Sequence, residues 1–342
     1  MANKDCSQRL SNFELLRIIA MFMVLMVHAN FWAIGSPTIS EIHSMPTTCI
    51  TRLFFEAISI SCVNIFVMIS GWFGIRPKLK SFCSFTYQIL FFTLGIYLIM
   101  IALGLTVPNT TKLASCFLLL DHQWFVKSYL ILYIFSPVLN SFSNNATEKQ
   151  QRYVIVSFFI FQFIYGWLSN GATFIMSGYS PISFFGLYLL AQYIRNFPIK
   201  IKNKPILYDI IIIVASVSLI ISLSLLSPHI LNRMYSYTNP LVIILSTFTI
   251  ILFSKINIKN SIINYIAASA FAVYLFHSNY CIAEPYFKSS IIHIYNSYNG
   301  LLCITMIGLF ISSVYILATI IDQIRKLSWN LLIKVICSSN KN

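Results

Sequence analysis

About ten apolar stretches, separated by short segments that carry most of the charge, divide this chain of 342 residues. A bilayer core about 30 Å thick needs about 20 apolar residues in a spanning helix, and most of the stretches are near that length. The pattern predicts an all-α fold, a polytopic integral membrane helical bundle with about ten transmembrane helices. The expected spans are 12–33, 53–75, 82–105, 124–139, 153–168, 180–195, 206–226, 238–254, 262–281 and 301–321.

The composition excludes a soluble globular domain. Hydrophobic residues make up 58% of the chain, charged residues 9%, and the mean hydropathy is +0.78, whereas soluble chains average about 25% charged residues. The net charge of +14 does not indicate nucleic acid, because the basic residues lie in short clusters between apolar stretches, as in cytoplasmic loops. We expect a multi-pass protein of the cytoplasmic (inner) membrane, without a cleavable signal peptide.

Lysine and arginine predict the orientation of the spans, because they concentrate in cytoplasmic loops. Every second loop is basic, and the opposite loops hold only Arg52, Lys112, Arg233 and Lys288. Both termini are therefore predicted to be cytoplasmic, with an even number of spans. A membrane domain is expected over 1–321, and 322–342 is predicted to be a basic, amphipathic cytoplasmic tail that lies on the membrane surface.

The first apolar stretch carries two ionisable residues, Arg17 and His28, eleven residues apart. At 3.6 residues per turn this spacing is about three turns, so both side chains share one helix face, about 16 Å apart along the axis. Glu14 lies one turn before Arg17 on that face. Ionisable groups inside a span are costly and suggest a functional cavity. Two simpler alternatives stay open: Arg17 reaches the headgroups, or His28 bonds a neighbouring helix.

The predicted topology also separates the other polar candidates. His28, His122 and His277 fall in the outer half, whereas Arg17 and Arg76 lie toward the cytoplasm. Such a path suits a substrate that enters from the cytoplasm and reacts near the outer half. The simpler alternatives are interfacial histidines and a topology signal at Arg76. The eight cysteines are scattered without a Cys-x-x-Cys pair, so we expect neither a metal site nor a disulfide framework.

Four motifs occur in order along the chain. The first combines Glu14, Arg17, Ala20 and His28, and it resembles the acidic residue, the Arg-x-x-Ala step and the following histidine that open the membrane acyltransferase-3 family. The other three are 63–71 (VNIFVMISG), 122–130 (HQWFVKSYL, with Pro137 beyond) and 271–277 (FAVYLFH). They occur in the family's order and cover nearly the whole chain.

The chain also departs from the family pattern at two positions. Asn64 stands where the second motif usually has Asp, and Tyr129 stands where the polysaccharide-modifying branch has the Glu of a Trp-Ser-x-x-x-Glu motif. The acceptor that this branch modifies is therefore not assigned to this chain.

The resemblance implies transfer of an acyl group, most simply acetyl, from acyl-coenzyme A to a hydroxyl of a cell-surface polysaccharide or lipid-linked sugar. His28 would be the general base, since burial favours the neutral imidazole. Glu14 would assist it by orienting Arg17, and Arg17 and Arg76 would bind donor phosphates through paired hydrogen bonds. The further site candidates are Asn64, Ser70, His122, Trp124 and His277.

The donor, acetyl-coenzyme A, is expected as a substrate and not as a tightly bound cofactor. The expected partners are acyl-coenzyme A, the glycan or lipid-linked sugar acceptor and membrane lipids, without nucleic acid. A secondary transporter is the main alternative, but it favours internal repeats and carboxylates near the midplane, whereas Glu14, Glu56 and Asp209 lie near span ends. A polysaccharide flippase or polymerase is a third possibility. The identity of the acceptor and its side of the membrane stay open. The sequence also leaves open whether the acyl group passes directly or through an acyl-enzyme.

Overall fold

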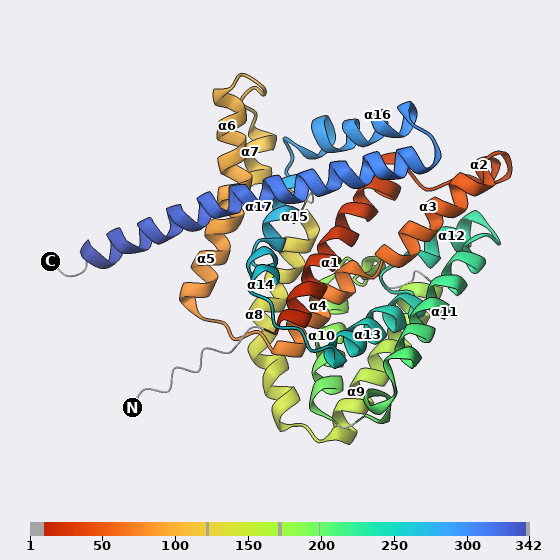
Figure 1. Ribbon diagram of the computed structural model, residues 1–342. Coiled ribbons are helices and arrows are strands. Elements are labelled where there is room, and N and C mark those ends of the chain that lie inside the picture. The colour runs from red at the N-terminus through yellow and green to blue at the C-terminus, as the bar shows by residue number, and fades with distance from the viewer. Residues whose placement is uncertain (1–9, 121–122, 170–172, 198, 340–342) are drawn as a thin grey trace.

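The computed structural model describes residues 10–120, 123–169, 173–197 and 199–339, and within them it contains helices and no strand (Figure 1). The all-α prediction is therefore confirmed. The first half comprises α1 (Ser11–Val27), η1 (His28–Ile34), α2 (Ile39–Ser44), α3 (Pro46–Ser59), α4 (Cys62–Phe73), α5 (Leu79–Leu90), η2 (Phe91–Gly95), α6 (Ile96–Ala102), α7 (Thr110–Cys116), α8 (Trp124–Asn145), α9 (Glu148–Phe161) and η4 (Gln162–Leu168). The second half comprises η5 (Met176–Gly178), α10 (Pro181–Asn196), η6 (Lys200–Asn203), α11 (Ile206–Ser224), α12 (Pro228–Met234), α13 (Pro240–Lys255), α14 (Ser261–Ala267), α15 (Ala270–His277), η7 (Ala283–Lys288), α16 (Ser289–Ser297) and α17 (Gly300–Ser339).

Each apolar stretch predicted from the sequence overlaps a helix or a run of consecutive helices. In the part of the chain that the structure describes, six helical segments are long and apolar enough to cross a membrane. They are Ser11–Ile34, Pro46–Phe73, Leu79–Ala102, Trp124–Asn145, Ile206–Ser224 and Gly300–Val335. Pro240–Lys255 and Ser261–His277 are shorter apolar helices. These segments support a multi-pass membrane protein.

Several helices begin at residues suited to that position. Thr147 caps α9 in a capping box with Gln150, and Ser180 caps α10, whose first residue is Pro181. Both arrangements satisfy backbone N–H groups that lack a partner in the first helical turn. The short polar loops thus fix where these apolar helices start.

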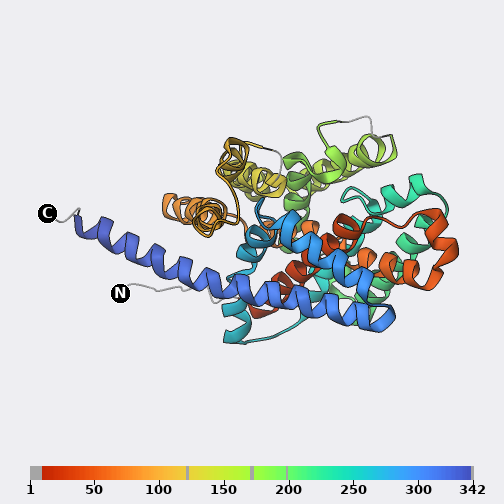
Figure 2. The same ribbon diagram turned by 90° about the horizontal axis from the view of Figure 1, so that it is seen from above.

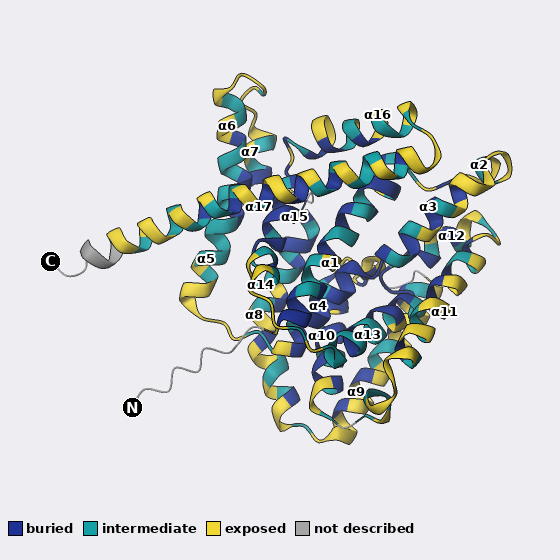
Figure 3. Cartoon of the chain, in the orientation of Figure 1, coloured by how far each residue is buried: buried dark blue, intermediate teal, exposed yellow. Residues whose placement is uncertain are grey.

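The centre of the bundle depends on close contact between α4 and α10. α4 is buried along almost its whole length (Figure 3). A Cβ atom at Gly71 would lie 2.4 Å from the carbonyl oxygen of Tyr188, so only glycine permits this approach. The Tyr188 hydroxyl donates to Asn140 Oδ1 at 2.8 Å and accepts from the Ile75 N–H at 2.7 Å. α4, α8 and α10 are therefore joined through one buried tyrosine.

α1 lies parallel to the pair α14–α15, and hydrogen bonds fix their register at both ends. Ser11 Oγ accepts from the Asn260 N–H at 3.0 Å, and His28 Nδ1 lies 2.8 Å from His277 Nε2. Both pairs have a sequence separation of 249 residues. A residue of α1 therefore lies level with the residue 249 positions later, which places Arg17 beside the end of α14.

Polar contacts join helix ends that the sequence assigns to the same side. Lys255 at the end of α13 pairs with Asp209 at the start of α11. Arg195 donates to the carbonyl of Trp72 at 2.6 Å. At the opposite end, Arg52 donates to the carbonyl of Gly35 within the single loop predicted between the first two spans. The first two contacts hold helix ends together at one side of the bundle.

α17 continues without a break across residue 321, where the predicted tail begins. Asp322 and Arg325 are buried. Figures 1 and 2 show the later part of α17 projecting beyond the other helices. The start of the predicted tail is thus packed into the bundle.

Candidate active site

A cavity of about 300 Å³ lies between α1, α4, α5, α8, α14 and α15. Arg17 and His28 both line it, as expected for two residues on one face of the same helix. The helix rise separates them by about 16 Å. The cavity therefore has a guanidinium toward one end and an imidazole toward the other. Among the described residues that line it, none is Asp or Glu.

His28 is the first residue of the π-helical segment η1, where the backbone hydrogen bonding of α1 changes from the α-helical to the π-helical pattern. Its Nδ1 lies 2.8 Å from Nε2 of His277, and His277 Nδ1 lies 2.6 Å from the carbonyl oxygen of Val273. A carbonyl oxygen only accepts, so Nδ1 of His277 must donate. In a neutral ring, Nε2 of His277 is then an acceptor, and Nδ1 of His28 must donate to it.

This sequence of hydrogen bonds fixes the tautomer of His28. With the proton on Nδ1, the neutral His28 ring carries its lone pair on Nε2. His28 lines the cavity, whereas His277 lies behind it, 1% exposed and packed 5.3 Å from Phe287 between ring centroids. The arrangement resembles a triad in which one group orients an imidazole base, with His277 in the orienting position.

Arg17 is held by Glu14, the second residue predicted to be catalytic. One Nη atom of Arg17 donates to both carboxylate oxygens, at 2.8 and 2.9 Å. The Glu14 side chain is 8% exposed and that of Arg17 30% exposed. Glu14 lies fourteen residues before His28, about 21 Å at 1.5 Å per residue. It can therefore orient Arg17 but cannot contact the His28 ring.

Aromatic side chains form much of the cavity wall. Trp124, predicted as a site candidate, lies 5.9 Å from Tyr237 between ring centroids. Ser70, also predicted, donates to the Phe66 carbonyl at 3.0 Å, so the hydroxyl of Tyr129 donates to Ser70 Oγ at 3.1 Å. These residues give the cavity an apolar surface with a few fixed polar groups, as is usual for small-molecule sites.

The remaining predicted residues lie apart from the cavity surface. Asn64 is buried, and its amide donates to the Tyr237 carbonyl at 3.0 Å. This hydrogen bond holds the segment that brings the Tyr237 side chain into the cavity wall. Arg76 is exposed beyond the end of α4 and does not line the cavity. His122 lies outside the described residues. The structure thus brings Arg17, His28, Ser70 and Trp124 together.

Two polar lining residues were not singled out from the sequence. Gln88 lines the cavity from α5, and the position of this polar residue within an apolar stretch was an available signal. Tyr237 lies between α12 and α13, in a segment without any motif. Only the tertiary structure brings it against α4 and α8.

Several of the helices around this cavity are long and apolar enough to cross a membrane, and the described residues that line it include one imidazole, that of His28, and one guanidinium, that of Arg17. The sequence pattern of the family described as "Acyltransferase domain" (Acyl_transf_3) matches residues 10–321, so the chain belongs to this membrane acyltransferase family. No curated protein and no solved structure matches the chain. The family predicted from the four motifs is confirmed.

Proposed function

We propose that this acyltransferase moves an acetyl group from acetyl-coenzyme A to a hydroxyl of a cell-surface polysaccharide or lipid-linked sugar at the inner membrane. The observation that carries the proposal is the bonding of His28 to His277, which leaves His28 Nε2 as an acceptor in a cavity shared with Arg17. A sugar hydroxyl is a poor nucleophile at neutral pH and needs such a base.

In the proposed reaction, the acceptor hydroxyl gives its proton to His28 Nε2 as its oxygen attacks the thioester carbonyl carbon. The new C–O bond forms, and the C–S bond then breaks. The proton on His28 passes to the departing sulfur, which leaves as the coenzyme A thiol. His277 keeps its proton on Nδ1 and accepts from His28 throughout, so it stabilises the transient imidazolium. This direct transfer needs no acyl-enzyme.

Arg17 is the proposed donor-phosphate ligand. Glu14 occupies one Nη, which leaves Nε and the second Nη as a pair of donors matched to two phosphate oxygens. The uncharged pantetheine arm would then extend toward His28, over the separation of about 16 Å set by the helix rise.

We also propose about ten spans with both termini in the cytoplasm. The support is the alternation of basic loops together with the contacts between helix ends assigned to one side, such as Lys255 with Asp209. In this orientation Arg17 faces the cytoplasm, where the donor is made, and His28 lies in the outer half.

Membranes that contain the protein are expected to release coenzyme A thiol from acetyl-coenzyme A and to transfer radiolabelled acetyl to a glycan fraction. Membranes from cells without the gene are the control. Uptake of label into vesicles without thiol release would instead indicate a transporter and would contradict the proposal.

Arg17→Lys is expected to weaken acetyl-coenzyme A binding by about tenfold, because lysine cannot reproduce the paired contact with phosphate. Calorimetry on detergent-purified wild type, Arg17→Lys and Arg17→Ala measures the effect. Lysine reaches the headgroups as well as arginine does. If Arg17→Lys binds acetyl-coenzyme A with wild-type affinity, Arg17 does not bind the donor phosphate and acts only at the membrane interface.

A further inference from the structure

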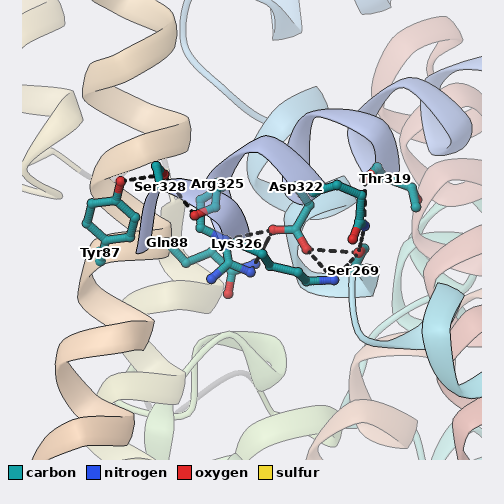
Figure 4. Close-up of polar contacts among 9 residues, drawn as sticks. Tyr87, Gln88, Ser269, Thr319, Asp322, Arg325, Lys326 and Ser328 are labelled. Carbon is teal, nitrogen blue, oxygen red and sulfur yellow. Dashed lines mark hydrogen bonds and ion pairs between the residues drawn. The ribbon is translucent and has the colours of Figure 1, made fainter. Parts of the chain in front are cut away.

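A buried ion-pair cluster lies where α17 continues past the segment matched by the family. Asp322 is fully buried, and its carboxylate accepts from Arg325 Nε at 2.9 Å and from Ser269 Oγ at 2.8 Å. Lys326 Nζ lies 3.1 Å from the same carboxylate, and Gln88 Nε2 donates to it at 3.3 Å. Figure 4 shows these side chains converging on Asp322 from α5, α17 and the turn between α14 and α15.

The cluster lies at the Arg17 end of the candidate active site. The register between α1 and α14–α15, offset by 249 residues, puts Ser269 level with residue 20 of α1, one turn beyond Arg17. Ala267 and Ala268, just before Ser269, line the cavity together with Arg17 and Gln88. Gln88 donates to Asp322, so the cluster adjoins the cavity wall at this end.

Two cations share one carboxylate in this cluster, and they are not equivalent. Arg325 holds Asp322 through Nε and Nη2, and its side chain is 7% exposed. Lys326 donates to Ser269 Oγ at 2.9 Å, lies over the ring of Tyr265 and is 29% exposed. Arg325 can thus neutralise Asp322 alone, which leaves the lysine ammonium as the excess positive charge.

The size of the cavity limits which part of the donor it can hold. At about 300 Å³ it is at the small end of ligand sites, which suits the acylated pantetheine arm. The bulkier nucleotide, with its pyrophosphate and its 3′-phosphate, would remain at the Arg17 end. Arg17 supplies one paired contact there, so a second phosphate needs another cation.

We propose that Lys326 binds the 3′-phosphate of the acyl-coenzyme A nucleotide, with Asp322 and Arg325 positioning its ammonium group. The inference rests on the proposed donor. In this inference, the part of α17 beyond residue 321 takes part in recognising the nucleotide.

The test compares binding of coenzyme A and 3′-dephospho-coenzyme A to purified full-length protein by calorimetry. The wild type is expected to prefer coenzyme A by about tenfold, the effect of one charge-assisted hydrogen bond. Lys326→Gln should lose about tenfold in affinity for coenzyme A and nothing for the dephospho form. Lys326→Arg should keep the preference. Lys334→Gln, an exposed site on the same helix, is the matched control for net charge and should behave as wild type.

The outcomes separate this inference from the proposed function. A wild type that binds both ligands equally, or a Lys326→Gln protein that keeps the wild-type preference, overturns the role of Lys326 and leaves the donor assignment in place. Equal weakening toward both ligands would show that Lys326 contacts a group that both ligands share, such as the pyrophosphate, and also overturns it. A wild type that binds neither ligand overturns the proposed donor itself.

Discussion

Replacing His28 by alanine is expected to lower acyl transfer by about 10²–10⁴-fold, the usual contribution of a general base. The described residues that line the cavity include no carboxylate that could replace it. Transfer of radiolabelled acetyl from acetyl-coenzyme A, measured in membranes that contain equal amounts of each protein, checks the result. Donor affinity should change little, because Arg17 and its contact with Glu14 remain.

The control must separate lost chemistry from lost folding. His28→Ala leaves Nε2 of the buried His277 without its donor, which costs about 1–3 kcal/mol of stability. Thermal unfolding of the purified variant should therefore be measured beside its activity. His43→Ala, an exposed histidine on α2, is the matched substitution and should keep full activity. Near-normal turnover by a folded His28→Ala protein would exclude His28 as the general base.

Replacing His277 by leucine is expected to reduce kcat by about 10- to 100-fold, the range known for partners that orient metal-bound histidines. Leucine cannot accept from Nδ1 of His28, so the tautomer is no longer fixed and the imidazolium loses its partner. The KM for acetyl-coenzyme A should stay near the wild-type value, because His277 lies behind His28 and not on the cavity surface.

A positioning role differs from a packing role in its response to a conservative change. His277→Gln provides an amide oxygen that can accept from His28, so it should recover much of the lost kcat. His277→Leu fills the site without an acceptor. If both variants lose kcat equally, or if only KM changes, His277 does not act through His28.

The sequence predicted most helices because long apolar stretches leave few alternatives in a membrane. It predicted less well where a helix is polar or changes its hydrogen bonding. α3 begins at Pro46, seven residues before the predicted start at 53, because polar residues such as Thr47, Thr48 and Arg52 conceal its first turns. The π-helical segment that begins at His28 also left no signal in the hydropathy pattern.

The candidate site could be predicted only in part, for a related reason. Spacing within one helix placed Arg17 and His28 on one face, and both line one cavity. The pairing of His28 with His277 depends on the register of two helices 249 residues apart. Arg76, chosen for its charge, is exposed outside the cavity. Arg325 and Asp322 form an ion pair within α17, but the hydrogen bonds from Ser269 and Gln88 to Asp322 come only from the tertiary structure.

The parallel course of α1 and α14–α15 sets a parity rule for the membrane crossings between them. Two helices that run in the same direction must be separated by an odd number of crossings. Among the described residues, four of the long apolar segments lie between them: Pro46–Phe73, Leu79–Ala102, Trp124–Asn145 and Ile206–Ser224. If all four cross, an odd number of the shorter segments α9–η4, α10 and α13 must cross as well. Counting all three gives seven crossings, the number required by ten alternating spans.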